Sequence, residues 1–381
     1  MSKDIYLDFN ATTPVDPSVL QSMLPYFTEK FGNAASKTHS YGWLAEEAVE
    51  IAREQVALLI GSEKNEITFT SGATESINLG LKGIFEAYSS KGKHIVTIAT
   101  EHKAVLDCCK HLEKYGAEIT YLPVDSEGQI DLNILISSIT DKTILCCLML
   151  ANNETGVVLP MKEISAIVHE KNCLLMSDAT QACGKIEVDV NDLGIDVLTL
   201  SAHKMYGPKG AGALYLRRRG PRVHIIAQQD GGGHENNRRS GTLNVPGIVG
   251  LGKACELSKK LMPTEYLRIK ALRDKLESSL QHNHKVSVRA QNSLRLPNTS
   301  NISFPGFKAD RIIKKLNNLA VATGSACSSA LPEASHVLKA MGMSEQEALS
   351  SIRFSLGRNT STEDIESALK MIENILAGKP V

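Results

Sequence analysis

The chain has 381 residues, and its 42 lysines and arginines balance its 42 aspartates and glutamates. This zero formal charge predicts no global attraction to nucleic acid or to an anionic membrane, and we expect direct binding to neither. No apolar run reaches the ~20 residues of a membrane span, and the N-terminus lacks the apolar core of a signal peptide. None of the eight cysteines forms a C-x-x-C pair. We therefore expect a reduced cytoplasmic protein with no structural disulfide and no resident metal.

Apolar runs typical of strands alternate with amphipathic helical patterns over most of the chain. This alternation predicts an α/β fold with a mostly parallel sheet. Such sheets bind ligands beyond the carboxyl ends of their strands. Amphipathic helices are predicted at 43–60 and 162–171, and strands at 67–69, 94–98, 118–122, 143–150, 174–177, 197–200 and 213–216.

The regular alternation of strand and helix patterns ends near Pro263. Beyond it, a charged helix is predicted at 264–281 and a strand at 301–304. Residues 360–363 read Thr-Ser-Thr-Glu, a capping box that opens a last amphipathic helix. We expect a large domain at 15–262 and a smaller α+β domain built from 1–14 and 263–381.

A lysine and an aspartate follow two of the predicted strands. Lys204 comes after the run 197–200, and Asp178 ends the run 174–177. Each alone is usually a solvated lysine or a turn-capping carboxylate. As a pair they suit a pyridoxal 5'-phosphate (PLP) enzyme, in which a lysine forms a Schiff base with the cofactor aldehyde and an acid keeps the pyridine nitrogen protonated.

The segment Thr70–Ser76 follows a predicted strand and opens a helix. Free N–H groups and the helix dipole form a phosphate cradle there, with Gly72 allowing close approach and Thr74 adding a hydroxyl. A simple helix cap is the alternative reading of this segment. No Walker A or G-x-G-x-x-G motif supports ATP or dinucleotide binding. Ser201 and His203, beside Lys204, would close on the phosphate from another strand end.

Two further strand ends carry polar side chains. His102 stands at a position that suits stacking on an aromatic cofactor or carrying protons. Asn153, in Asn152-Asn153-Glu154, would hydrogen-bond the cofactor or a substrate carboxylate. A capped histidine and an ordinary turn are the alternatives.

Cys327 lies among small and hydroxyl residues in Gly324-Ser325-Ala326-Cys327-Ser328. This setting favours a reactive thiol over a buried small residue. By contrast, Cys146 and Cys147 fall within an apolar run and are predicted to be core residues that point in opposite directions.

Arg353 alternates with apolar residues on a predicted strand, so it faces inward and needs an anion. A substrate carboxylate suits its bidentate fork, and a structural ion pair is the alternative. The basic loop Arg238-Arg239-Ser240-Gly241-Thr242 indicates only that an anion lies near.

As an ordered set, these motifs closely resemble the group I cysteine desulfurases of the NifS/IscS type. These are fold-type I PLP enzymes of the class V aminotransferase superfamily. The resemblance runs from Tyr6–Pro14 to about Arg358. It implies that L-cysteine is converted to L-alanine, with the sulfur held as a persulfide on Cys327 and passed to an acceptor protein. It also implies an obligate homodimer.

The resemblance assigns roles residue by residue. Lys204 looks like the Schiff-base lysine, Asp178 the partner of the pyridine nitrogen, and His102 the stacking and proton-carrying residue. Gln181 would hold the ring oxygen, and Cys327 would be the nucleophile and would contact an iron–sulfur cluster during transfer to such an acceptor. The phosphate would be held by Ala73, Thr74, Ser201, His203 and the neighbouring subunit's copy of Thr242, and the substrate by Asn33, Asn153 and Arg353.

The chain departs from the family pattern at Ala34, where proline is frequent, and at Ala322-Thr323, where the family usually has two serines. It also ends at Val381, without the longer tail that helps dock an iron–sulfur scaffold. The sulfur acceptor therefore stays open among iron–sulfur assembly, tRNA thiolation and DNA phosphorothioation. Other functions left open are a PLP aminotransferase or lyase, such as a selenocysteine lyase, and a non-catalytic sulfur carrier.

Overall fold

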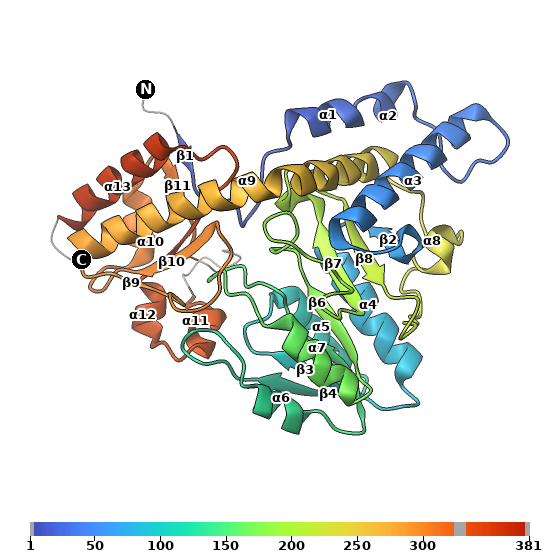
Figure 1. Cartoon of the computed structure of the whole chain (residues 1–381), viewed down its shortest axis with the longest axis horizontal. Coiled ribbons are helices and arrows are strands. Elements are labelled where there is room, and N and C mark those ends of the chain that lie inside the picture. Colours follow the sequence, from blue (N-terminus) through green and yellow to red (C-terminus); the bar gives the residue numbers. More distant parts are fainter. Residues whose placement is uncertain (1–3, 324–332, 378–381) are drawn as a thin grey trace.

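The computed structural model describes residues 4–323 and 333–377, so Cys327 lies outside the described residues. The largest feature is a seven-stranded sheet, in which only β8 runs antiparallel to its neighbours (Figure 1). This arrangement confirms the predicted α/β class with a mostly parallel sheet. In spatial order the strands are β2 (Ile67–Thr70), β8 (Gly212–Leu216), β7 (Val197–Ser201), β6 (Leu174–Asp178), β5 (Thr143–Cys147), β3 (His94–Ile98) and β4 (Glu118–Leu122).

Helices cover both faces of this sheet, because successive residues of its buried strands point to opposite sides. Cys147 packs in the cluster that includes α4 (Ala73–Tyr88), whereas Cys146 packs in the cluster that includes α3 (Ser40–Ile60). The prediction that these two cysteines are oppositely directed core residues is confirmed. The other flanking helices are α5 (Lys103–Glu113), α6 (Leu132–Ser138) and α7 (Met161–Glu170).

The predicted strand 143–150 is too long by three residues, since β5 ends at Cys147. The chain nevertheless stays beside β6, because the N–H groups of Leu148 and Leu150 donate to the carbonyls of Met176 and Asp178. The apolar run therefore predicts burial correctly but not the point where the regular ladder stops.

A second hydrophobic cluster surrounds a smaller antiparallel sheet of order β12-β10-β9. The first residues of the chain join it, because Ile5 and Leu7 are buried in this cluster. Its strands are β1 (Ile5–Tyr6), paired with β11 (Leu319–Ala320), and β9 (Ser287–Val288), β10 (Thr299–Ser303) and β12 (Ser351–Ser355), and its helices are α10 (Ala309–Lys315) and α13 (Thr362–Leu376). Helices α11 (His336–Ala340) and α12 (Glu345–Leu349) pack in a separate small cluster with Val157.

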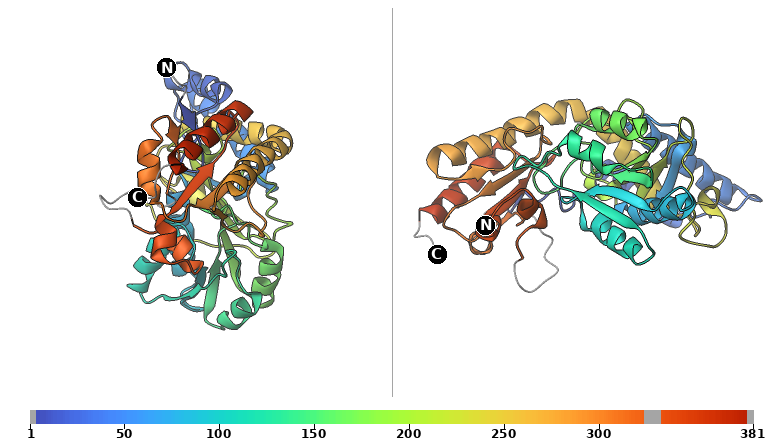
Figure 2. Two further views of the ribbon diagram at one scale, coloured as in Figure 1. Left: turned by 90° about the vertical axis from the view of Figure 1, so that its left-hand side faces the viewer. Right: turned by 90° about the horizontal axis from the view of Figure 1, so that it is seen from below.

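Helix α9 (Val245–Asn283) joins the two regions and runs along both of them (Figures 1 and 2). Leu251 packs in the core against the large sheet, and Leu276 packs in the core of the small one. The helix continues through Pro263, so the predicted helix at 264–281 is only its second half. The expected boundary at 262–263 falls inside this helix, and the division into two domains stays a prediction. None of the described helices has the length and apolarity needed to cross a membrane.

The remaining short elements are α1 (Pro17–Met23), α2 (Pro25–Thr28) and α8 (His234–Asn237), with 3-10 turns at Lys64–Glu66 and Ala202–Lys204. The capping box before α13 is real but shifted by one residue. Ser361, not Thr360, is the N-cap, and Asp364, not Glu363, is its reciprocal partner. Two overlapping Ser/Thr-x-x-acid patterns explain the error.

Candidate active site

Lys204 lies in the 3-10 turn that follows β7. Its Nζ atom donates hydrogen bonds to the carbonyls of Asn10, at 2.5 Å, and Ala11, at 2.7 Å. Burial, and then nearby Arg353, lower the pKa of Lys204 to about 8, while Asp178 and Asp8 oppose the shift. A lysine held by neutral carbonyls, with an amine that loses its proton easily, suits nucleophilic attack on an aldehyde.

Asp178 is the last residue of β6, the strand next to β7. It pairs in register with Thr199, whose hydroxyl donates to the Asp178 Oδ1 atom at 3.2 Å. The Thr180 N–H donates to the same oxygen at 2.9 Å. These bonds fix a buried carboxylate at the carboxyl edge of the sheet, beside the strand that leads to Lys204.

The N-terminus of α4 lies against the end of β7. Gly72 is the N-cap and supplies no side chain, so the first-turn N–H groups of Ala73 and Thr74 are free of a side-chain cap. The backbone of Gly72 has φ 151°, and a Cβ there would lie 3.7 Å from the Ser201 hydroxyl. Gly212 on β8 permits this approach, because its Cβ would lie 2.5 Å from the Gly72 Cα. The result is a glycine-lined helix start beside a serine hydroxyl.

His102 is the N-cap of α5, and its Nδ1 atom accepts a hydrogen bond from the Ala104 N–H at 3.1 Å. Desolvation lowers the pKa of His102; Asp178 opposes that shift and Lys204 reinforces it. The lowered pKa favours the neutral ring, and because Nδ1 accepts from Ala104, the proton of that ring lies on Nε2, which is therefore a donor. Its expected position at the same sheet edge as Asp178 is observed.

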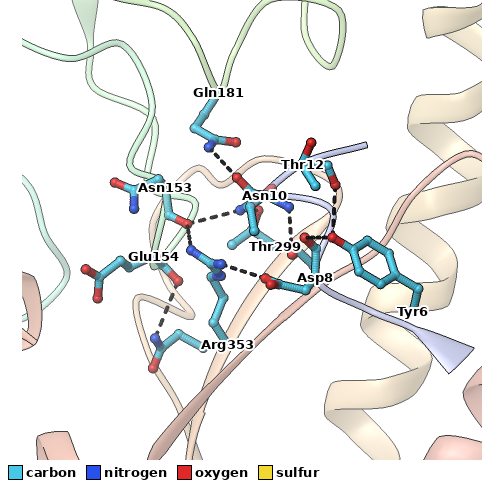
Figure 3. A network of polar contacts seen from close by, with 12 residues as sticks. Tyr6, Asp8, Asn10, Thr12, Asn153, Glu154, Gln181, Thr299 and Arg353 are labelled. Carbon is cyan, nitrogen blue, oxygen red and sulfur yellow. Dashed lines mark hydrogen bonds and ion pairs between the residues drawn. The ribbon is translucent and has the colours of Figure 1, made fainter. Parts of the chain in front are cut away.

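A hub at Asn10 connects the two sides of the site, and Figure 3 shows its main contacts. The Asn10 carbonyl accepts the Gln181 amide at 3.0 Å in addition to Lys204. The Asn10 side chain donates to the Asn153 carbonyl at 3.1 Å and to the Thr299 hydroxyl at 2.8 Å. Asn10, in the segment that follows β1, thus contacts residues from both the large and the small sheet.

Arg353 reaches the same region from β12. Its Nη1 atom donates to the Asn153 carbonyl at 3.1 Å, and its Nη2 atom pairs with Asp8 at 2.6 Å (Figure 3). The Nε atom is buried and has no hydrogen-bond partner among the described residues. An unused N–H donor on a buried cation points to an anionic ligand. Both alternatives for this arginine are thus present, a structural ion pair and a free donor edge.

Three other predicted site residues are less engaged. His203 is partly buried and its Nδ1 atom lies 3.2 Å from the Thr12 hydroxyl; burial, then Lys204, lowers its pKa to about 4. Asn33 is exposed, and its side chain caps its own turn by accepting the Ala35 N–H. Thr242 is exposed as well, and within the described residues no hydrogen bond or ion pair joins it to Lys204.

The sequence pointed to neither Asp8 nor Glu101. Glu101 is fully buried; its Oε1 atom accepts the Met149 N–H, while Oε2 is unpartnered within residues 4–323 and 333–377. Burial, then Asp178, raises the pKa of Glu101 well above its usual value, which favours its protonated form. Asp8 lies inside the Tyr6–Pro14 motif, and its place in that motif was the only signal in the sequence that pointed to it. For Glu101 the only such signal was its position next to His102.

Comparison with known proteins agrees with this geometry. Residues 5–368 match the family model described as aminotransferase class-V. The chain belongs to this family. Class V aminotransferases of this type are fold-type I enzymes that use PLP. The residues present suit that cofactor, since a lysine amine, a buried carboxylate and an uncapped, glycine-lined helix start face one sheet edge.

Individual class V relatives are similar over nearly the whole chain. A cysteine desulfurase IscS from Anaeromyxobacter sp. (strain Fw109-5) is 52% identical over 98% of this chain and 92% of its own. A solved NifS-like protein is 38% identical with a TM-score of 0.92, covering 98% of this chain and 99% of that one. A solved structure of SspA in complex with cysteine is 34% identical with a TM-score of 0.81, covering 92% and 98%.

Proposed function

We propose that this chain is a PLP-dependent cysteine desulfurase, which takes sulfur from L-cysteine, releases L-alanine and holds the sulfur as a persulfide on Cys327. One observation carries the proposal: Lys204 and Asp178 lie at the ends of adjacent strands, facing the start of α4. The similarity to cysteine desulfurases and to a solved relative with bound cysteine supports the choice of substrate.

The bound cofactor supplies an electron sink for the bonds at the substrate α-carbon. Lys204 would hold it through its amine, Asp178 would pair with its pyridine nitrogen, and Gln181 would donate to its ring oxygen. His102 would stack on the ring. The phosphate would be held by the N–H groups of Ala73 and Thr74 together with Ser201, His203 and the partner subunit's Thr242.

The substrate is held by its carboxylate. Arg353 offers its unpartnered Nε edge, and Asn153 and Asn33 complete the binding region. Lys204, whose pKa is lowered to about 8, moves the α-proton in its neutral form, and neutral His102 carries a proton beside it. The Cys327 thiolate forms an S–S bond to the substrate sulfur as the C–S bond breaks, and the electron pair of that bond stays on the β-carbon, which takes up a proton to become the methyl group of alanine. Cys327 itself lies outside the described residues.

We also infer that the protein forms a homodimer, and exposed apolar side chains support this inference. Large apolar side chains on α1 to α3 are exposed, among them Phe27, Trp43 and Ile51 at 58%, 55% and 52%. Such a patch on one face favours burial against a second copy. A homodimer would bring the exposed Thr242 of each subunit to the other's phosphate site. The reaction is placed in the cytoplasm, where the seven described cysteines, all free, stay reduced.

The test is to replace Cys327 with alanine and to follow three signals separately. The Cys327→Ala variant is expected to keep the visible absorption of bound PLP and to lose both persulfide formation and transfer of ³⁵S from labelled cysteine. The matched control is Cys255→Ala, a buried cysteine of α9. Continued sulfur loading by Cys327→Ala would refute the nucleophile assignment.

Two companion measurements separate the alternatives. Selenocysteine lyase activity predicts that the Cys327→Ala variant still turns over selenocysteine at the wild-type rate. A non-catalytic carrier predicts that Lys204→Ala still delivers sulfur from cysteine. The acceptor, whether for iron–sulfur assembly, tRNA thiolation or DNA phosphorothioation, is to be identified by transfer of ³⁵S from the loaded enzyme to candidate proteins.

A further inference from the structure

Lys185 is a second lysine near the site, and the proposed mechanism does not use it. It lies in the turn after β6, four residues beyond Gln181. Its Nζ atom donates to the Gln181 Oε1 atom at 2.7 Å and lies 3.5 Å from the Asn10 Oδ1 atom. The side chain thus contacts the residue proposed to hold the cofactor's ring oxygen.

The contact decides which way the Gln181 amide faces. A glutamine amide has an oxygen end that only accepts and a nitrogen end that only donates, whereas an ammonium group only donates. With Oε1 accepting from Lys185, the Nε2 end faces the Asn10 carbonyl at 3.0 Å. That carbonyl also accepts from the Lys204 amine, so the donor end of Gln181 is directed to the reactive side of the site (Figure 3).

Gly184 holds Lys185 in this place. It has φ +77°, and a Cβ there would lie 2.9 Å from Met205 Cγ and 3.0 Å from Ser258 Oγ. Met205 directly follows Lys204, so the turn packs closely on the segment that carries the Schiff-base lysine. A larger residue at 184 would strain the backbone and separate the two lysines.

The charges around Lys185 are mostly cationic. Burial, then Lys204 and then Arg353 lower its pKa to about 7, while the Cys183 thiol opposes the shift. On the other side, Asp178 and Asp8 act on Lys204. A cation held beside Lys204 disfavours a further proton on the Lys204 nitrogen.

We propose that Lys185 is a positioning residue that fixes the Gln181 amide with its N–H₂ end toward the ring oxygen of the bound cofactor. The donor and the nearby cation together lower the proton affinity of the linkage between Lys204 and the cofactor. This inference rests on the proposed PLP function. It assigns to Lys185 a role that differs from covalent attachment and from proton transfer.

The test uses the holoenzyme and the pH dependence of its visible absorption. In Lys185→Met, the Gln181 amide loses its fixed orientation, so the absorption midpoint is expected to rise by about one pH unit. The dissociation constant for PLP, measured separately, is expected to rise several-fold. Lys253→Met removes a lysine that pairs with Glu256 on α9, and it should leave the midpoint unchanged.

A double-variant cycle distinguishes positioning from a general charge effect. Gln181→Ala alone should also raise the midpoint, and adding Lys185→Met to it should produce little further shift. Additive shifts would overturn the proposal, because Lys185 would then act without Gln181. An unshifted midpoint in Lys185→Met would overturn it as well.

A conservative variant protects the test against a folding defect. Lys185→Arg keeps a side chain that only donates, so it is expected to restore a midpoint near that of the wild type; a midpoint like that of Lys185→Met would contradict positioning. Wild-type protein that shows no visible band after incubation with PLP would instead refute the proposed function, and this inference would fall with it.

Discussion

The cofactor side and the substrate side of the site are stabilised in different ways. On the cofactor side, Lys204 donates to two main-chain carbonyls and Asp178 accepts from a main-chain N–H and a threonine hydroxyl. On the substrate side, Arg353 is paired with a carboxylate of the chain itself, Asp8. Hydrogen bonds to the backbone therefore fix the cofactor side. On the substrate side, the charges of Arg353 and Asp8 already balance, so an anion that binds there must compete with Asp8 for the guanidinium.

Removing the lysine should give the largest effect. Lys204→Ala is expected to lower the rate of alanine formation at least about a thousand-fold, because both the covalent anchor and the proton carrier are lost. Borohydride reduction followed by denaturation should leave no cofactor attached to the variant. Lys253→Ala is the control, and substantial turnover by Lys204→Ala would show that the cofactor side does not depend on this amine.

The cofactor side also depends on a buried ion pair away from the chemistry. Glu235 forms a bidentate pair with Arg53 and accepts the Phe69 N–H at 2.7 Å, at the end of β2. Glu235→Gln leaves the buried Arg53 with only the partly exposed Glu50 as an ion-pair partner, and it is expected to lower the free energy of unfolding by about 3 kcal/mol.

Denaturant titration of the cofactor-free protein measures the Glu235→Gln effect. Asp192→Asn, which breaks the exposed pair with Lys162, is the control and should leave the midpoint in place. If both substitutions lowered the free energy of unfolding equally, burial would not be the reason that the Arg53–Glu235 pair stabilises the protein.

Substitutions on the substrate side should change the affinity for cysteine and the stability of the unliganded protein separately. Arg353→Met is expected to raise KM for cysteine roughly 10- to 100-fold, the loss of hydrogen bonds between charged groups. Asp8→Asn should act in the opposite direction on KM, because the guanidinium then lacks its internal anion until substrate binds, while the unliganded protein becomes less stable. Steady-state kinetics and thermal melts test both; a raised KM in Asp8→Asn would mean that Asp8 orients Arg353 rather than competes for it.

The smallest effect concerns His203. Its pKa is lowered in the folded protein from 6.5 to about 4, so the unfolded chain binds more protons between these values. Stability from this group is present above about pH 6.5 and is lost as pH falls toward 4. His203→Gln should flatten the fall of the melting temperature over that range, compared with His224→Gln at an exposed position. An unchanged slope would contradict this assignment.

The two sides also differ in how far sequence predicts them. Asp178 and Lys204 follow apolar runs whose ends mark the edge of a parallel sheet, so their proximity follows from the topology. The pairing of Arg353 with Asp8 joins residues 345 positions apart in the sequence, and no local pattern encodes it. Similarly, Lys185 has an ordinary turn sequence, and only the packing of Gly184 on Met205 directs it inward. The role of Cys327 stays a prediction.

Helix α9 has a consequence for how the molecule unfolds. At 39 residues it is about 58 Å long, and one half is buried in each core. If either core melts, the half of the helix that packs in it loses its tertiary contacts and unfolds. The unfolding can then spread into the other half through Pro263, where an intrahelical hydrogen bond is missing. The two cores are therefore expected to denature together in one cooperative transition, with Pro263 as the point where that coupling is weakest.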